Sequence, residues 1–248
     1  MDLSENIIYE DADILAINKP AGLIVHPDGR TKEPSVSGWL VEKYPEVRGV
    51  SDENEELQTT NDESDRDGVV HRLDKETSGV LLLAKTDEGL KCLKEQFKNR
   101  EIQKIYYVFV YGNMKEDHGT LNLPIGKSPS DFRKYSAGRG ATGLKREATT
   151  YFQVLKRGDG VTLVEARPKT GRTHQIRVHF TALQRPVVGD KLYASTKPEM
   201  LGFKRLALHA REITFRDLSD KSHTINAPFP EDFINAFGAI DYKPKDLP

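Results

Sequence analysis

The residues that point most directly to chemistry are those of the tetrapeptide 71–74 (HRLD), which stands shortly before the apolar run 80–84. This order places the carboxylate of Asp74 in a polar loop beside Arg72, at the edge of a segment that must be buried. A carboxylate held near cationic groups stays ionised with fixed geometry, which suits a nucleophile or a general base. An ordinary surface ion pair at the start of a strand fits the same residues, because structural ion pairs also perturb carboxylates.

Three further blocks combine polar residues with glycine or proline beside apolar segments: 18–26 (NKPAGLIVH), 104–112 (KIYYVFVYG) and 169–179 (KTGRTHQIRVH). Each also has a purely structural interpretation, as a turn or as the edge of a strand with amphipathic tyrosines. His174 and His179 are five residues apart, which puts them on different faces of a helix, so a metal-binding pair is not expected there.

Composition sets the class of protein. The chain has 248 residues, of which 37% are hydrophobic and 30% are charged, as in a soluble globular protein. The single cysteine, Cys92, excludes an internal disulfide and a cysteine-based zinc site. The longest apolar run is far too short to span a membrane, and the first residues do not have the pattern of a secretion signal. We therefore expect a cytoplasmic protein.

The charge is distributed unevenly along the chain. Nine acidic and two basic side chains in the segment 46–67 give it a net charge of −7, which leaves +6 for the rest of a chain whose total is −1. The segment is also poor in apolar residues, so we expect a flexible acidic insertion. Two groups of bases lie elsewhere, in Arg133, Lys134, Arg139, Lys145 and Arg146, and in Arg167, Lys169, Arg172 and Arg177. Such groups permit a polyanionic partner but do not require one.

Local patterns predict both strands and helices. Strands are expected at 7–10, 14–18, 80–84, 105–111, 149–155, 161–166 and 213–215. Helices are expected at 35–44, at 87–99 with Thr86 as N-cap, through Leu183 with Thr173 as N-cap, and at 231–237. The turn 157–160 (RGDG) predicts a hairpin between two of the strands. Because no regular alternation of strand and helix is present, the fold class is α+β, with a largely antiparallel mixed sheet flanked by helices and loops.

Taken together, the blocks resemble the RluA-type family of RNA pseudouridine synthases. The block around Asp74 is the family's signature, and 18–26, 169–179, 185–194 (RPVVGDKLYA) and 205–215 (RLALHAREITF) follow in the expected order. The resemblance covers most of the chain. It implies the pseudouridine synthase fold, and an isomerase that detaches uracil from ribose, turns it and rejoins it through carbon 5, without cofactor or metal.

By position, Asp74 resembles the family's catalytic aspartate, and Tyr106 the tyrosine that lies against the target base. Arg177 resembles the basic residue that pairs with the aspartate, and Arg72 the arginine that helps to hold the flipped-out state. We further expect His71, Arg172 and His174 to bind substrate. Residues alone do not decide whether Asp74 attacks the sugar carbon or removes a neighbouring proton.

Many relatives carry an RNA-binding domain of the S4 type before the catalytic core, and the early first strand predicts that this chain does not. We therefore expect a single catalytic domain over 1–248, acting as a monomer on ribosomal or transfer RNA. RNA selection is then expected from the basic segments and from the loops in 127–146.

Three other classes of protein compete with this one. A non-catalytic RNA-binding or chaperone protein of the same fold would be marked by the loss of Asp74, Tyr106 or Arg177, and all three are present. A glycoside hydrolase needs two carboxylates at a set separation. Glu76 could be the second one, although no motif supports it. A serine hydrolase lacks its Gly-x-Ser-x-Gly motif.

Overall fold

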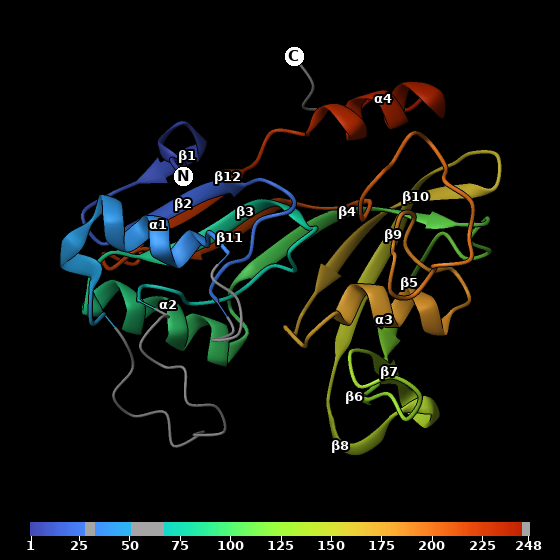
Figure 1. Cartoon of the computed structure of the whole chain (residues 1–248), viewed down its shortest axis with the longest axis horizontal. Helices are drawn as coiled ribbons and strands as arrows, with labels where there is room; N and C mark the ends of the chain where they lie inside the picture. Colours follow the sequence, from blue (N-terminus) through green and yellow to red (C-terminus); the bar gives the residue numbers. More distant parts are fainter. Residues whose placement is uncertain (28–32, 51–66, 245–248) are drawn as a thin grey trace. The chain divides into compact units, whose positions relative to one another are not determined.

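The computed structural model describes residues 1–27, 33–50 and 67–244, and the chain divides into two compact units. Unit 1 comprises Met1–Gln103 and Ala210–Pro228, and unit 2 comprises Lys104–His209 and Phe229–Pro248. Each unit combines strands with helices (Figure 1). The mixture of helices and mainly antiparallel strands confirms the predicted α+β class. No helix in the described ranges is long and apolar enough to cross a membrane.

The sequence predicts one catalytic domain over 1–248, and this remains a prediction, since the division into two compact units does not decide it. Most of the acidic insertion predicted at 46–67, namely 51–66, lies outside the described residues. At its borders, a turn of 3-10 helix, η2 (Pro45–Val47), precedes Gly49, whose backbone N–H donates to the carboxylate of Asp67 at 2.8 Å.

In unit 1 the strand order is β1-β2-β3-β11, and β12 pairs with β11. These strands are β1 (Ile7–Glu10), β2 (Ile14–Lys19), β3 (Ser78–Ala84), β11 (Leu208–Arg216) and β12 (Ser222–Asn226). Strands β2 and β3 are antiparallel, with Ile17 opposite Leu81. All seven residues of β3 are buried, as expected for a strand covered on both faces. The loop that carries Asp74 therefore leads directly into the centre of this layer.

The helices of unit 1 are α1 (Val36–Lys43) and α2 (Asp87–Asn99), and a 3-10 turn, η1 (Ser4–Asn6), precedes β1. Helix α2 starts where the sequence predicts, because the hydroxyl of Thr86 accepts a hydrogen bond from the N–H of Gly89 at 3.1 Å. Its buried residues Leu90 and Leu93 face the core, and the helix runs along the strands of unit 1 (Figure 1).

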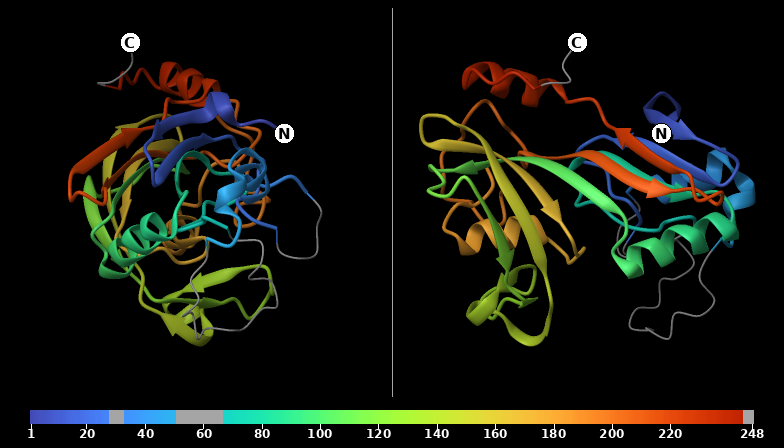
Figure 2. Two further views of the ribbon diagram at one scale, coloured as in Figure 1. Left: turned by 90° about the vertical axis from the view of Figure 1, so that its left-hand side faces the viewer. Right: turned by 180° about the vertical axis from the view of Figure 1, so that it is seen from behind.

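In unit 2 the strand order is β4-β10-β9-β5. These strands are β4 (Gln103–Tyr111), β5 (His118–Asn122), β9 (Thr149–Arg157) and β10 (Val161–Pro168). Strands β9 and β10 form the predicted hairpin. Helix α3 (Gln175–Ala182) and helix α4 (Glu231–Ala239) lie on opposite sides of these strands (Figure 2). On the α4 side, Phe233 and Phe237 pack against Phe109 of β4, with ring centroids 5.7 and 5.9 Å apart.

A second, small sheet of unit 2 has the order β7-β6-β8. Its strands are β6 (Ile125–Lys127), β7 (Tyr135–Ala137) and β8 (Thr142–Arg146), with a 3-10 turn, η4 (Gly138–Gly140), between the last two. The small sheet lies beside α3, and Ile125, Ala148 and Val178 form a buried cluster between them (Figure 1). This cluster fixes the segment 125–146 against the helix that carries Arg177.

Some boundaries differ from the sequence prediction. Strands β5, β6, β7, β8 and β12 were not predicted, and β11 is longer than the expected 213–215. Helix α3 begins at Gln175, and its N-cap is His174 rather than the predicted Thr173, because His174 has a left-handed backbone with a φ of 56°. That conformation cannot continue a right-handed helix, so the residues before it stay in a loop.

Candidate active site

The Asp74 loop is anchored by a buried ammonium group. Lys19 has no exposed surface, and its Nζ donates to the carbonyl oxygens of Pro20, Leu23 and Lys75 at 2.7, 2.8 and 3.1 Å. A buried charge is tolerated when such partners satisfy it. Because Lys75 follows Asp74, the loop 20–23 and the loop of Asp74 are tied together at the carbonyl next to the carboxylate.

Two backbone features complete the geometry of this loop. The N–H of Thr77 donates to the carbonyl of Asp74 at 3.0 Å, which closes a turn. Gly79, at the start of β3, has a φ of 112°, and a Cβ there would lie 2.1 Å from the carbonyl oxygen of Ala210. Only glycine permits that approach. Gly79 thus lets the loop enter the sheet, with Asp74 half-buried.

The two basic residues before Asp74 have different surroundings. The Nε2 atom of His71 accepts a hydrogen bond from the N–H of Leu82 at 3.0 Å, and its ring lies 4.8 Å from that of Phe97. His71 therefore supports the strand β3 from the side. Arg72 is exposed and available to a ligand. The substrate-binding roles of both residues stay predictions.

Tyr106 lies on β4 in unit 2, opposite Ala166 of β10, with 9% of its surface exposed. The next residue, Tyr107, points the other way and packs against Phe229, with ring centroids 5.0 Å apart. The alternation of a strand therefore separates the two tyrosines by face. Tyr107 is part of the core under α4, which leaves Tyr106 as the candidate for contact with a substrate.

Lys104 lies two residues before Tyr106 and so on the same face of β4. The ammonium group of Lys104 lies next to Gly171, since a Cβ added to that glycine would be 4.0 Å from the Nζ atom. Burial lowers the pKa of Lys104 to about 8.

Arg177 is held by a carboxylate that the sequence analysis did not single out. Its Nε and Nη2 atoms donate to Oδ2 and Oδ1 of Asp190 at 2.8 and 2.9 Å. Asp190 is 2% exposed, and its Oδ1 also accepts from the N–H groups of Leu192 and Tyr193 at 2.9 and 3.0 Å. Such bidentate, charge-assisted bonds fix the plane of the guanidinium group.

The partner of Arg177 in the sequence prediction is Asp74, and that pairing stays a prediction. Asp190 could have been found, since it lies in the block 185–194 that carries part of the resemblance. The preceding Gly189 has a φ of 71°, and a Cβ there would be 2.0 Å from the carbonyl oxygen of Arg205. The glycine therefore lets this loop pack closely enough for the carboxylate to reach Arg177.

Tyr193 connects Arg177 with the predicted site residue His174. The guanidinium carbon of Arg177 lies 5.0 Å from the centre of the Tyr193 ring, a cation–π contact. The Tyr193 hydroxyl is 2.9 Å from Nδ1 of His174 and accepts from the N–H of Tyr135 at 2.9 Å. The structure therefore brings His174 and Arg177 together around one tyrosine ring, which is also bonded to β7.

Arg172 belongs to a loop that Gln175 holds in place. The Oε1 atom of Gln175 accepts from the N–H of Arg172 at 3.0 Å and from the hydroxyl of Thr170 at 2.7 Å. Its Nε2 atom donates to the carbonyl of Thr149 at 3.0 Å. The guanidinium of Arg172 donates to the carbonyl of Glu147 at 3.0 Å. Arg172, His174 and Arg177 thus lie on one well-fixed segment of unit 2.

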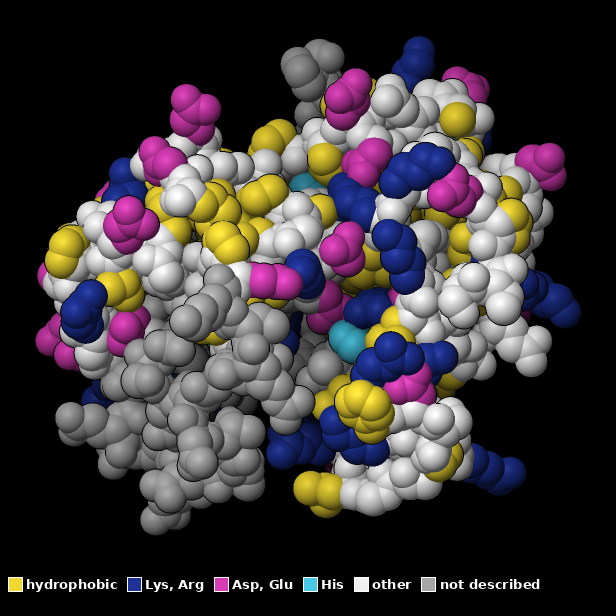
Figure 3. Space-filling view, viewed as in Figure 1, with side chains coloured by type: hydrophobic (Ala, Val, Ile, Leu, Met, Phe, Trp, Pro, Cys, Tyr) yellow, Lys and Arg dark blue, Asp and Glu magenta, His cyan; other side chains and the backbone are white. Residues whose placement is uncertain are grey.

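The surface of unit 2 is basic around the small sheet. Figure 3 shows Lys and Arg side chains gathered over this part of the chain. Two large apolar side chains stand out among them, Phe132 at 82% and Leu144 at 80% exposure. Exposed aromatic and apolar groups among bases are typical of surfaces that bind single-stranded nucleic acid. In the described ranges no group of His, Cys, Asp and Glu side chains could hold a metal ion.

Comparison with known proteins gives the family. The sequence model described as RNA pseudouridylate synthase matches residues 13–182. The dual-specificity RNA pseudouridine synthase RluA of Vibrio cholerae is 39% identical, over 92% of this chain and 83% of that protein. The ribosomal large subunit pseudouridine synthase D of Xanthomonas campestris is 35% identical, over 96% of this chain and 70% of that protein.

An uncharacterized RNA pseudouridine synthase of Synechocystis is 37% identical, and this chain spans 66% of its length. Among solved structures, human RNA pseudouridylate synthase domain containing 4 is similar with a TM-score of 0.73 and 25% identity, over 96% of this chain and 94% of that one. The chain belongs to the RNA pseudouridine synthase family, whose members are isomerases acting on RNA. The predicted resemblance and the predicted fold are thereby confirmed.

Proposed function

We propose that this chain converts specific uridines of structured RNA into pseudouridine, with large-subunit ribosomal RNA as the favoured substrate and transfer RNA as the alternative. The observation that carries the proposal is the family match over 13–182, which includes Asp74, Tyr106 and Arg177. The preference for ribosomal RNA is supported by the similarity to a ribosomal large subunit enzyme.

Asp74 is the proposed catalytic carboxylate. Cleavage of the bond between uracil and ribose builds positive charge on the sugar, and a fixed carboxylate stabilises that charge or forms a covalent adduct. The anchoring of the loop by Lys19, through the carbonyl of Lys75, supports this role because it limits the positions that the carboxylate can take. Preorganised groups need little rearrangement during the reaction.

Tyr106 and Arg177 are proposed to act on the base and on the carboxylate. A uridine must leave its stack to be reached, at a cost of a few kcal/mol, and an aromatic ring offsets part of that cost. Tyr106 offers such a ring on the face of β4 that α4 does not cover. Arg177, fixed by Asp190, is proposed to pair with Asp74 and to hold its orientation.

The remaining predicted residues and the basic surface are proposed to bind RNA. Arg72 is exposed and stands two residues before Asp74. It is proposed to fill the space that a flipped base leaves. His71, Arg172 and His174 are proposed to contact the substrate near the reacting nucleotide. The bases of 127–146 are proposed to bind phosphates, which would make affinity depend strongly on salt. The proposal needs no cofactor, and a monomer in the cytoplasm suffices.

The experiment is pseudouridine mapping of total RNA from a strain that lacks this protein, beside its parent and a complemented strain. We expect one or a few uridines of ribosomal or transfer RNA to lose the modification and to regain it on complementation. Complementation with Asp74→Asn should fail, whereas complementation with Glu76→Gln should succeed. Unchanged pseudouridine at every mapped position would contradict the proposal.

A further inference from the structure

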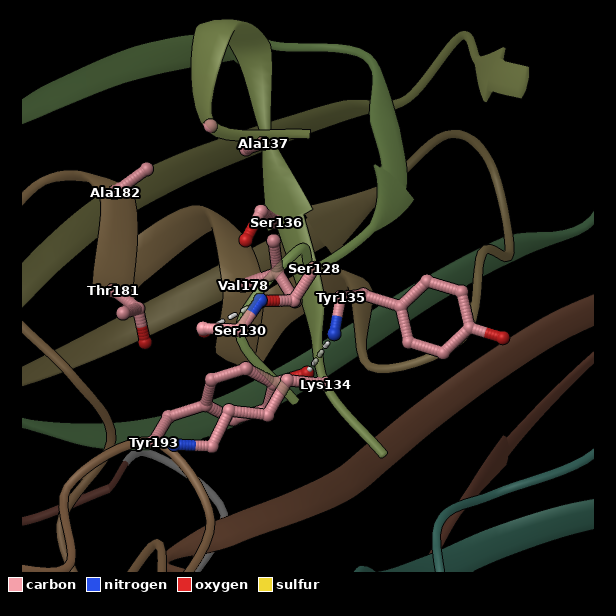
Figure 4. A pocket seen from close by; sticks show the side chains of 11 residues that line it. Ser128, Ser130, Lys134, Tyr135, Ser136, Ala137, Val178, Thr181, Ala182 and Tyr193 are labelled. Carbon is pink, nitrogen blue, oxygen red and sulfur yellow. Dashed lines mark hydrogen bonds between the residues drawn. The ribbon is translucent and has the colours of Figure 1, made fainter. Parts of the chain in front are cut away.

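A pocket of unit 2 lies beside the small sheet and shares Tyr193 with the candidate active site. It has a volume of about 290 Å³, and its lining comes from β7, from the loop before it and from the end of α3 (Figure 4). Pockets for small ligands span roughly 300 to 1,000 Å³. At about 290 Å³ this pocket lies at the lower edge of that range, so it suits a ligand no larger than one nucleotide and is too small for a folded partner.

Within the described ranges, two polar groups of the lining make no close hydrogen bond or ion pair, although the charge of Lys134 acts at longer range on the carboxylate of Asp131. Within the ranges that the structure describes, neither the ammonium of Lys134 nor the hydroxyl of Ser136 has a hydrogen-bond or ion-pair partner. Both residues are only partly exposed. A further hydroxyl, that of Thr181, donates to the carbonyl of Arg177 at 2.7 Å and keeps its acceptor capacity. The pocket thus offers one cation and several hydroxyls to a ligand.

The rest of the lining is apolar or aromatic. Ala137 and Val178 contribute alkyl surface, and Tyr193 contributes its ring. The hydroxyl of Tyr193 is already bonded to His174 and to the N–H of Tyr135, so the ring is held in position. In Figure 4 the side chains of Lys134 and Tyr193 reach the same end of the pocket, whereas the ring of Tyr135 points away. A flat apolar group could lie near Tyr193 with an anion at Lys134.

We propose that this pocket binds one unpaired nucleotide of the substrate RNA other than the target uridine, with its base inside and its phosphate at Lys134. The inference rests on the proposed function. A phosphate alone would use Lys134 but leave the apolar lining uncovered, and an apolar ligand would leave Lys134 without a partner. A nucleotide satisfies both, and the bases around the small sheet would bind the adjoining phosphates.

The pocket also has a physical connection to the candidate active site. The ring of Tyr193, which lines the pocket, lies 5.0 Å from the guanidinium carbon of Arg177, and its hydroxyl is hydrogen-bonded to His174. A nucleotide in the pocket would therefore contact Tyr193, the residue that supports both Arg177 and His174. The pocket thus selects RNA that presents an unpaired nucleotide at a set distance from the target.

Binding is tested first by NMR on the full chain with labelled alanine and valine methyl groups. The probes are AMP, CMP, GMP and UMP, with ribose 5-phosphate and inorganic phosphate as comparisons. We expect the signals of Ala137 and Val178 to shift with at least one nucleotide and much less with the two phosphates. The methyl groups of Ala16 and Ala84, which are buried in unit 1, are the controls and should not shift when a nucleotide binds in the pocket.

Two variants at the end of α3 locate the binding site. Ala182→Trp adds a large side chain at the exposed rim of the pocket, and Leu183→Trp adds the same side chain one residue beyond the lining. The nucleotide-dependent shifts should disappear in the first variant and persist in the second. Shifts that persist in Ala182→Trp, no shifts in the parent protein, or equal shifts with inorganic phosphate would each overturn the proposal.

Turnover separates this proposal from the proposed function. The substrate is total RNA from the deletion strain, containing uridine with tritium at carbon 5, whose release reports each isomerisation. We expect Ala182→Trp to raise KM about tenfold, as for the loss of one base contact, and Leu183→Trp to behave as the parent. If the parent releases tritium and both variants match it, the pocket proposal fails alone. If the parent releases none, the proposed function fails.

Discussion

The guanidinium of Arg177 and the carboxylate of Asp190 form a buried pair with two parallel hydrogen bonds of 2.8 and 2.9 Å. The pair lies between α3 and the loop after Gly189, so it joins the helix that follows the segment 169–174 to the block 185–194. The same carboxylate accepts two backbone N–H groups, which orients it independently of Arg177. The arginine is therefore positioned by a part of the chain that is itself fixed.

Asp190→Asn should strongly destabilise the protein. Asparagine keeps an oxygen for the backbone N–H groups of Leu192 and Tyr193 but leaves the buried charge of Arg177 without its counterion. Breaking such a pair costs about 3 to 5 kcal/mol. The measurement is the free energy of unfolding in urea, together with kcat, which should fall because Arg177 is no longer held.

Asp220→Asn, which breaks the exposed pair with Arg216, is the control and should change stability by less than about 1 kcal/mol. Equal effects of the two changes would show that the Asp190 pair is unimportant.

The lowered pKa of Lys104 should make the free energy of unfolding depend on pH. Its pKa is lowered from 10.5 to about 8 in the folded protein, so between these pH values the unfolded chain binds more protons. The contribution of Lys104 to the free energy of unfolding is thus most unfavourable below pH 8 and improves as the pH rises toward 10.5. Lys104→Met should be more stable than the parent at neutral pH, by at most about 3 kcal/mol, and this advantage should shrink above pH 8.

The check on Lys104 is a series of urea unfolding curves between neutral and alkaline pH. Lys91→Met, at an exposed position of α2, is the matched control and should differ from the parent by the same small amount throughout. A difference between Lys104→Met and the parent that does not vary with pH would show that the ammonium is not strained by burial.

Phe132 should contribute to RNA affinity by stacking on an unpaired base. Stacking on an aromatic side chain is worth about 1 to 3 kcal/mol per base, so Phe132→Ala should weaken binding about tenfold. Phe132→Trp should keep the affinity, because any large aromatic ring can stack. Leu218→Ala, at a position in unit 1 with 47% exposure, should have no effect. Affinities of the four proteins for the substrate RNA, measured at one salt concentration, provide the test, and unchanged binding by Phe132→Ala would refute the role.

Activity should survive removal of metal ions. The proposed chemistry assigns to Asp74 and Arg177 the electrostatic role that a metal takes in other enzymes. The measurement is tritium release after exhaustive treatment with EDTA, in monovalent salt sufficient to keep the RNA folded. Activity that is lost, and that returns with a divalent ion but not with more monovalent salt, would argue against this chemistry.

The sequence predicts much of the fold because local patterns agree with the tertiary structure. The first strand, β1, matches the prediction at both ends, and α2 begins after Thr86 and ends at Asn99 as expected. The missed strands of the small sheet are short, and β8 is exposed along its whole length. Strands β7 and β8 have no buried residue, so they lack the alternating pattern on which strand prediction depends, and β6, although Ile125 is buried, has only three residues. Their pairing is decided by contacts with β6 and α3.

The candidate site could be predicted only in part for a related reason. Asp74, Tyr106 and Arg177 stand in motifs that are recognisable along the chain. Asp190 becomes informative only when the fold brings it to Arg177, 13 residues away in sequence. Lys19 is similar: a lysine in a loop motif suggests a solvent-exposed charge, whereas the structure buries it among three carbonyl groups. Contacts of this kind depend on tertiary structure.

The most direct measurement is the turnover of purified Asp74→Asn beside Glu76→Gln and the parent protein, on RNA from the deletion strain. Asparagine keeps the shape of the side chain and removes the charge, so we expect no pseudouridine from Asp74→Asn while the protein stays folded and still binds RNA. Glu76→Gln, in the same loop, should retain near-parental activity. Turnover by Asp74→Asn above a small fraction of the parental rate would contradict the account, as would a loss of activity confined to Glu76→Gln.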